Sequence, residues 1–206
     1  MRIGIVACEV LKDEIEFLTK DDPDFVCREY LKFALHEHAE EMKRLLIEKV
    51  NALEGSVDAV LLGYATCQSL KNVTSSMIVP TVMLPGDDCI DALLGPDEYK
   101  AEKKKCIGTW FISPGWAVQG TEGLIEQFHL DSVEGTDPQY FLEMMFDSYE
   151  RCLFIDTGVG NDEFYMQRSK AFADNLKLRL DRRACSLERI GDCVTKVKEL
   201  AALNTN

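Results

Sequence analysis

Three cysteines in this chain follow runs of apolar residues that are typical of buried strands. Cys8, Cys67 and Cys89 each come after such a run, of which RIGIVA before Cys8 is one. Deprotonated cysteine binds soft metals, and three protein ligands leave one position of a tetrahedral zinc ion open for water or substrate. If these strands end at the same edge of a sheet, the sequence predicts a metal site that holds zinc or an iron–sulfur cluster.

The surroundings of Cys89 favour a cation over a free reactive thiol. Asp87 and Asp88 directly precede it in the stretch PGDDC. Two neighbouring carboxylates raise the pKa of a thiol, so Cys89 is a poor nucleophile by itself. A metal ion reverses this effect because it deprotonates the thiol and attracts the carboxylates.

His36 is the candidate for a fourth ligand. It lies in LHEH, at the start of a helical pattern over 36–53. An imidazole there can supply a nitrogen ligand or transfer a proton if the helix begins at the same edge. The alternative is that His36 is part of a solvated helix start.

A second set of residues predicts a small-molecule pocket. Trp116 follows the run GTWFIS, and Asp156, Thr157 and Gly158 follow the run CLFI. Side chains beyond strand ends are placed where α/β proteins bind ligands. The sequence therefore also admits a binding domain that uses these residues and no metal.

The spacing of apolar residues predicts alternating strands and helices. The expected strands are 2–7, 25–33, 58–63, 78–84, 108–113, 152–157 and 177–183, and the expected helices are 36–53, 90–105, 121–129, 137–150, 163–176 and 186–203. This alternation favours an α/β fold with a doubly wound, mostly parallel sheet and helices on both faces. We expect a single domain over residues 1–206, with Pro80 marking an early or edge position in its strand.

Composition limits the function classes. The chain has 206 residues, 46% of them hydrophobic, and a formal net charge of −13. Such acidity argues against nucleic acid as a partner, and no apolar run approaches the roughly 20 residues that cross a membrane. The start MRIGIVACEV lacks a signal-peptide pattern, so we expect a cytoplasmic protein.

The eight cysteines are not expected to form disulfides in that compartment, and no CxxC occurs among them. The five outside the predicted metal site are expected to pack as small apolar side chains: Cys27, Cys106, Cys152, Cys185 and Cys193. Neither a GxSxG nucleophile motif nor a phosphate loop ending in GK[ST] is present.

In several of these stretches the chain resembles the uncharacterised family known as domain of unknown function 1638. The matching stretches include IVACEV, LKFALHEHAEEM, AVLLGYATCQSL, VMLPGDDCIDALLGPDEY, GTWFISPGWA and CLFIDTGVGNDEFY. The resemblance implies that Cys8, Cys67, Cys89 and His36 are family features. It also implies a setting in anaerobic archaea and bacteria, often beside corrinoid-dependent methyltransferase systems.

The chain departs from this family at two positions. It has DDC at 87–89 where relatives commonly carry HDC, and it has Ala65 where relatives commonly have glycine. The first difference removes a histidine that would be available as a ligand or an acid–base group.

Two functions are expected from these observations. The first is a cytoplasmic metal-binding protein, with zinc or an iron–sulfur cluster, that serves corrinoid or one-carbon methyl transfer, any corrinoid being supplied by a partner. The second is an accessory protein without metal that binds a methyltransferase or a corrinoid protein. The sequence identifies no reaction and leaves the oligomeric state open.

Overall fold

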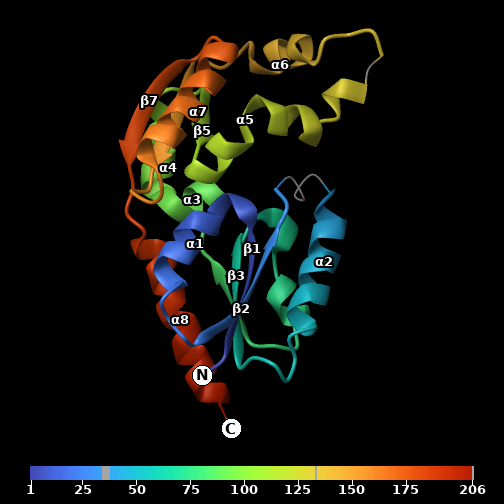
Figure 1. Ribbon diagram of the computed structural model, residues 1–206, viewed down its shortest axis with the longest axis vertical. Helices are drawn as coiled ribbons and strands as arrows, with labels where there is room; N and C mark the ends of the chain where they lie inside the picture. Colours follow the sequence, from blue (N-terminus) through green and yellow to red (C-terminus); the bar gives the residue numbers. More distant parts are fainter. Residues whose placement is uncertain (34–37, 133, 206) are drawn as a thin grey trace. The chain divides into compact units, whose positions relative to one another are not determined.

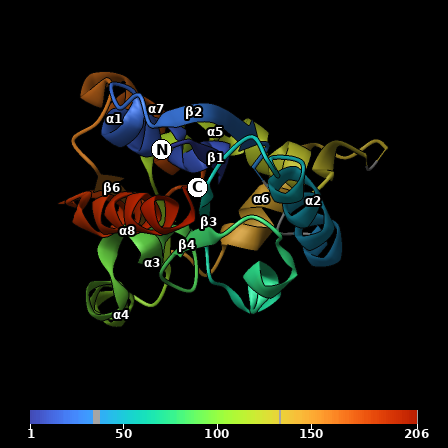
Figure 2. The same cartoon turned by 90° about the horizontal axis from the view of Figure 1, so that it is seen from below.

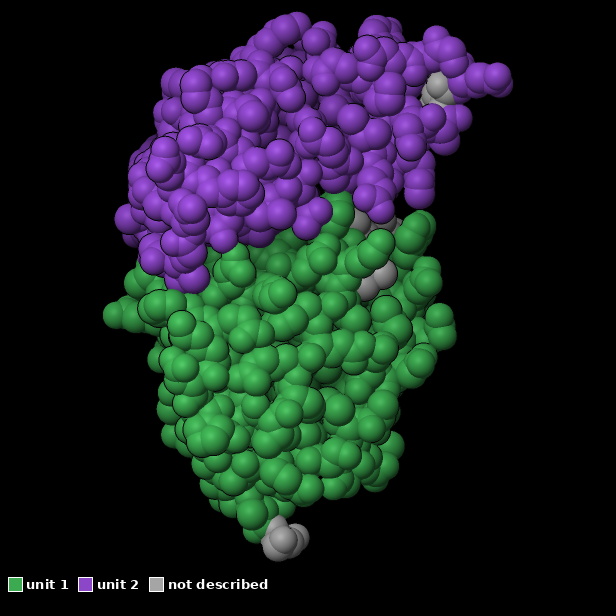
Figure 3. Space-filling model, in the orientation of Figure 1, with its two compact units in different colours: residues 1–96, 186–206 green, residues 97–185 purple. Residues whose placement is uncertain are grey.

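The computed structural model describes residues 1–33, 38–132 and 134–205. Contacts between Cα atoms divide the chain into two compact units, which Figure 3 distinguishes by colour. Unit 1 comprises residues 1–96 and 186–206, and unit 2 comprises residues 97–185. The prediction of a single domain over residues 1–206 stays a prediction.

Unit 1 is built on a four-stranded parallel sheet in the order β2-β1-β3-β4 (Figure 1). Its strands are β1 (Ile3–Cys8), β2 (Phe25–Leu31), β3 (Ala59–Ala65) and β4 (Thr81–Leu84). Its helices are α1 (Lys12–Thr19), α2 (Ala39–Asn51), α3 (Cys89–Leu94) and α8 (Glu188–Asn204), with short 3-10 turns η1 (Glu9–Leu11), η3 (Gln68–Leu70) and η4 (Val73–Ser76).

Helices cover both faces of this sheet because β1 and β3 are apolar on both sides. Val6 and Leu62 are fully buried in a cluster with Met42 and Leu46 of α2. On the opposite face α8 packs against β3 and β4, and Figure 2 shows α8 and α2 on opposite sides of the central strands. A Cβ atom on Gly63 would lie 2.7 Å from Ile15 Cδ1, so glycine there allows α1 to approach.

Unit 2 contains a three-stranded parallel sheet in the order β5-β6-β7. Its strands are β5 (Thr109–Ile112), β6 (Arg151–Asp156) and β7 (Arg179–Ala184). Its helices are α4 (Pro96–Lys105), α5 (Pro114–Gln127), α6 (Pro138–Phe146) and α7 (Asp162–Asn175), with the turn η5 (Leu130–Ser132). Cys152 and Phe154 of β6 pack in one apolar cluster with residues of α5, α6 and α7.

The predicted α/β class with parallel strands and surrounding helices is confirmed, although the strands form two sheets. The prediction for Pro80 is also confirmed, since β4 begins at Thr81 and lies at the edge of its sheet. Helix α1 was not expected, and the helix expected over 90–105 is two helices separated at Gly95.

Helix α5 is interrupted at Gly120, whose φ of 64° and ψ of −158° are not helical. Arg168 of α7 donates hydrogen bonds from Nη2 to the carbonyl of Val118 at 2.9 Å and from Nε to that of Ala117 at 3.3 Å. Residues other than glycine rarely adopt this backbone conformation. Glycine at position 120 therefore allows the break that Arg168 stabilises.

We expect Gly120→Ala to destabilise the protein by about 2 kcal/mol, because alanine is strained at this backbone conformation. The matched control is Gly191→Ala in α8, where φ is not positive and open space surrounds the added methyl group. That change should stabilise the protein by roughly 0.5 kcal/mol. Urea unfolding of both variants measures the difference, and equal stabilities would contradict the assignment.

Candidate functional site

The three cysteines predicted as metal ligands lie at one edge of the unit 1 sheet. Cys8 is the last residue of β1, Cys67 follows β3, and Cys89 is the first residue of α3, after β4. The strands β1, β3 and β4 are neighbours and run parallel. Their carboxyl ends therefore share an edge, as the sequence predicted.

Cys8 is a partly buried thiol beside an aromatic hydroxyl. Burial raises the pKa of the Cys8 thiol to about 11, and the charge of Glu9 contributes, while the Val10 backbone and the Tyr64 hydroxyl act in the opposite direction. The Tyr64 hydroxyl is itself buried, and among the described residues it has no hydrogen-bond partner of regular geometry. At neutral pH the unliganded Cys8 is therefore a neutral thiol.

Glu9 connects this edge to the end of β2. Its carboxylate accepts a hydrogen bond from the backbone N–H of Phe33 at 2.9 Å. His36, the predicted fourth ligand, lies outside the described residues, so its role stays a prediction. His38 precedes the first turn of α2 and is exposed.

Cys67 is positioned by hydrogen bonds that join the ends of β3 and β4. The backbone N–H and the hydroxyl of Thr66 both donate to the carbonyl of Leu84, each at 3.2 Å. The carbonyl of Cys67 accepts from the N–H of Leu70 at 3.0 Å, and its side chain packs against the apolar cluster under α2. This cysteine is therefore fixed at the sheet edge by both of its neighbouring strands.

The aspartates around Cys89 cap a helix. Asp88 Oδ1 accepts hydrogen bonds from the backbone N–H groups of Ile90 at 2.9 Å and Asp91 at 2.8 Å. It thereby provides an acceptor for two N–H groups in the first turn of α3. Asp91 Oδ2 in turn accepts from the N–H of Asp87 at 2.8 Å. Asp91 is only 4% exposed, and its Oδ1 has no hydrogen-bond partner within the described part of the chain. The acidic run therefore has a structural role that the sequence interpretation missed.

Within residues 1–33, 38–132 and 134–205, no group of three His, Cys, Asp or Glu side chains is arranged to hold a metal ion. The cysteines thus share an edge without forming a complete ligand set from these residues. Their donor chemistry suits a soft metal. The arrangement supports the site only in part, and the metal stays a prediction.

Asp156, Thr157 and Gly158 form a turn at the carboxyl end of β6. Asp156 Oδ1 accepts from the N–H of Gly158 at 2.9 Å, and its Oδ2 pairs with Arg182 Nη2 at 2.7 Å. Arg182 also pairs with Asp162 at 2.8 Å, so it joins this turn to the start of α7. Burial opposes ionisation of Asp156, but the Arg182 hydrogen bond prevails and lowers the pKa of that carboxyl.

Trp116 lies in the first turn of α5, in a helix that begins earlier than the sequence predicted. Its ring packs edge-on against Trp110, with 6.2 Å between ring centroids, and it contacts the apolar core of unit 2. A binding role for Trp116 and for the Asp156 turn stays a prediction.

Two of the five cysteines that were expected to pack as small apolar side chains are buried. Cys152 is 0% exposed and Cys193 is 2% exposed. Cys27 packs against the cluster under α2, whereas Cys106 and Cys185 are partly exposed. None of the eight cysteines, all of which lie within the described residues, forms a disulfide.

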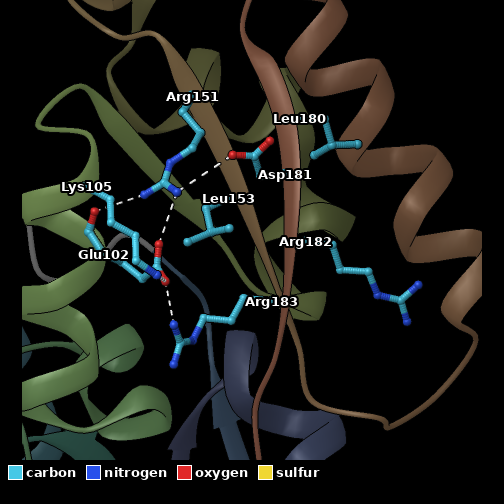
Figure 4. A pocket seen from close by; sticks show the side chains of 8 residues that line it. All are labelled: Glu102, Lys105, Arg151, Leu153, Leu180, Asp181, Arg182 and Arg183. Atoms are coloured by element: carbon cyan, nitrogen blue, oxygen red, sulfur yellow. Dashed lines mark hydrogen bonds and ion pairs between the residues drawn. The ribbon is translucent and has the colours of Figure 1, made fainter.

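Unit 2 contains a buried ionic network, shown in Figure 4, that was not predicted from the sequence. Arg151, 5% exposed, donates to Glu102 Oε2 at 3.0 Å, to the Glu102 carbonyl at 2.9 Å and to Thr109 Oγ1 at 3.0 Å. Arg183 pairs with Glu102 and Glu98. Glu102 lies in the lysine-rich run KAEKKK at 100–105, whose composition is typical of a solvated helix face. Its side chain is nevertheless only 3% exposed.

The network lines a cavity of about 600 Å³ between α4 and the strands β6 and β7. Arg182 contributes to the lining, but its side chain points to the other side of β7 (Figure 4). The charges near the cavity balance, with Lys105, Arg151 and Arg183 facing the carboxylates of Glu98, Glu102 and Asp181. We therefore interpret this network as a structural connection between α4 and the sheet.

Comparisons with known proteins identify a family and no function. A family model described as "Protein of unknown function (DUF1638)" matches residues 30–194. No curated protein and no solved structure matches the chain. No described helix is long and apolar enough to span a membrane.

The ionic network predicts acid sensitivity. Burial opposes ionisation of Glu102, but hydrogen bonds from Lys105, Arg183 and Arg151 outweigh it and lower the pKa of its carboxyl from 4.5 to about 2. The ionised carboxylate therefore stabilises the folded state fully above pH 4.5, and this contribution is lost as the pH falls toward about 2.

We expect Glu102→Gln to cost about 3 kcal/mol at neutral pH, because it removes the buried carboxylate that Arg151 and Arg183 share and leaves them with only Asp181 and Glu98, respectively, as charged partners. The control is Glu48→Gln, which removes an exposed pair with Arg44 at 3.7 Å and should cost under about 0.5 kcal/mol. Chemical unfolding over a pH series measures both effects. The native protein should lose more stability than the Glu102→Gln variant as the pH is lowered below 4.5. Equal losses in the two proteins would show that the low pKa assigned to Glu102 is wrong.

Proposed function

Because the chain belongs to this family of unknown function, no relative supplies a reaction, and we propose a function from the sheet edge itself. The proposal is that Cys8, Cys67 and Cys89 bind a zinc ion or an iron–sulfur cluster in a cytoplasmic protein. The observation that carries it is that the three cysteines follow three neighbouring parallel strands.

The chemistry of the cysteines determines how a metal would bind. None of the eight cysteines, all of which lie within the described residues, forms a disulfide. Cys8 is a neutral thiol without a ligand, so a metal ion must displace its proton to bind, which lowers the metal affinity at neutral pH. Zinc with an open position would supply Lewis acidity, and a cluster would supply electron transfer.

The link to corrinoid or one-carbon methyl transfer rests on the family resemblance alone. In this proposal a corrinoid protein or a methyltransferase is the partner, and any corrinoid is bound by that partner. The residues at the sheet edge carry no feature that is specific for a methyl group, so the metal and the methyl transfer are tested separately.

A second candidate is an accessory protein that binds a methyltransferase or a corrinoid protein and holds no metal. The raised pKa of Cys8 and the apolar packing of Cys67 favour it, because a neutral buried thiol behaves as a small apolar side chain. In this case the cysteines stabilise the sheet edge and bind nothing.

Metal analysis of protein purified without oxygen distinguishes the two candidates. The metal proposal predicts stoichiometric zinc, or iron with sulfide and visible absorption, because thiolates retain soft metals through purification. The Cys8→Ser, Cys67→Ser, Cys89→Ser triple variant should lose this metal. Cys106→Ser, which changes a partly exposed cysteine in unit 2, should retain it.

A colourless, metal-free protein that takes up neither zinc nor iron and sulfide would contradict the metal proposal. Retention of the metal by a folded triple variant would place the ligands elsewhere. If the native protein is metal-free and captures a corrinoid methyltransferase equally well with and without the three cysteines, the accessory function is supported.

A further inference from the structure

Helix α6 exposes apolar residues on the side opposite to the core. Leu142 and Phe146 are buried in the apolar cluster of unit 2. On the outer side Tyr140 is 59% exposed, Met144 is 60% exposed and Met145 is 39% exposed. The ring of Phe141 lies edge-on to Tyr140 at 5.7 Å between centroids. These four residues, Tyr140, Phe141, Met144 and Met145, form what we term the α6 stripe.

The spacing of these residues makes the stripe continuous. Tyr140 and Met144, like Phe141 and Met145, are separated by one helical turn and lie on the same side of α6. A single exposed apolar side chain is normal on a protein surface, but a contiguous group marks a contact surface. Methionine adapts its shape to a partner, which suits a surface that becomes buried only on binding.

The surroundings of the α6 stripe are acidic. Residues 121–150 contain eight Asp or Glu and no Lys or Arg. Asp137 caps the start of α6, Asp147 follows its end, and Asp131 lies in η5, which contacts α6. Glu143 is exposed on the helix itself and pairs with Lys177 at 3.2 Å. This pair, and the pair of Glu122 with Arg168 at 3.7 Å, offset two of the eight carboxylates.

We propose that the α6 stripe binds a positively charged amphipathic helix of another protein. The apolar face of such a helix covers the stripe, and its Lys or Arg side chains approach the carboxylates around it. A second copy of this chain is a poorer occupant, because two chains of net charge −13 repel each other.

The size of α6 sets the strength of this contact. Nine residues span about 14 Å of helix, so the buried area lies at the low end for protein interfaces. Binding should therefore be transient, and salt should weaken it because exposed charges contribute.

The test uses a fluorescent synthetic amphipathic helix of leucine and lysine, with a leucine–glutamate peptide of the same pattern as the control. Fluorescence anisotropy measures the affinity for the native protein, a Tyr140→Ser, Met144→Ser variant and a Glu143→Lys, Asp147→Lys variant. Each double variant should bind the lysine peptide about tenfold more weakly, because one loses apolar contact and the other reverses the charge. The matched control is Ile107→Ser, which changes a 93% exposed side chain of unit 2 outside α6 and should leave the affinity unchanged.

Circular dichroism verifies that each variant is folded. Unchanged lysine-peptide affinity in either folded double variant would overturn the proposal, as would equal binding of the leucine–glutamate peptide. If sedimentation shows a native dimer that Tyr140→Ser, Met144→Ser converts to a monomer, a second copy is the occupant and the proposal is wrong. The cysteine triple variant should bind the lysine peptide normally, so this test is independent of the metal proposal.

Discussion

The parallel pairing of β1 with β2 and β3, and of β3 with β4, determines the positions of Cys8, Cys67 and Cys89, the three candidate cysteine ligands of unit 1. Strands that run in one direction must end at one edge, and helices that return to the sheet must begin there. The residues that follow the strands are therefore collected at this edge although the sequence separates them widely. Burial of β1 and β3 on both faces stabilises these central strands against the helices on either side of the sheet.

Unit 2 depends in addition on buried charge. Arg151 begins β6, and its guanidinium is engaged by Glu102 of α4 and Thr109 of β5, so one side chain connects a helix and two strands. Removal of such charges from water is costly, and hydrogen bonds must offset that cost. The three donated hydrogen bonds do so in a specific geometry. The network therefore fixes α4 against the sheet and also makes this unit sensitive to acid.

The strands could be predicted because they are short apolar runs, which are local patterns. The carboxyl-edge position of the three cysteines followed from them. Helix α1 could not be predicted in the same way, because its sequence KDEIEFLT is mostly polar and yet Glu14 is buried. The capping role of Asp88 depends on α3 beginning at Cys89, and the pairing of Glu102 with Arg151 joins residues far apart in sequence. Such long-range relations leave no periodic signal.

The ionic network also bears on how unit 2 presents charge to other molecules. The cations of the network itself, Lys105, Arg151 and Arg183, are paired with the carboxylates of Glu98, Glu102 and Asp181. Residues 121–150 contain eight carboxylates and no Lys or Arg, and ion pairs with Arg168 and Lys177 offset two of these carboxylates. A negative potential around α5 and α6 raises the local concentration of cationic partners and accelerates their association. The same segment carries the exposed apolar side chains of α6, so attraction and contact act at one place.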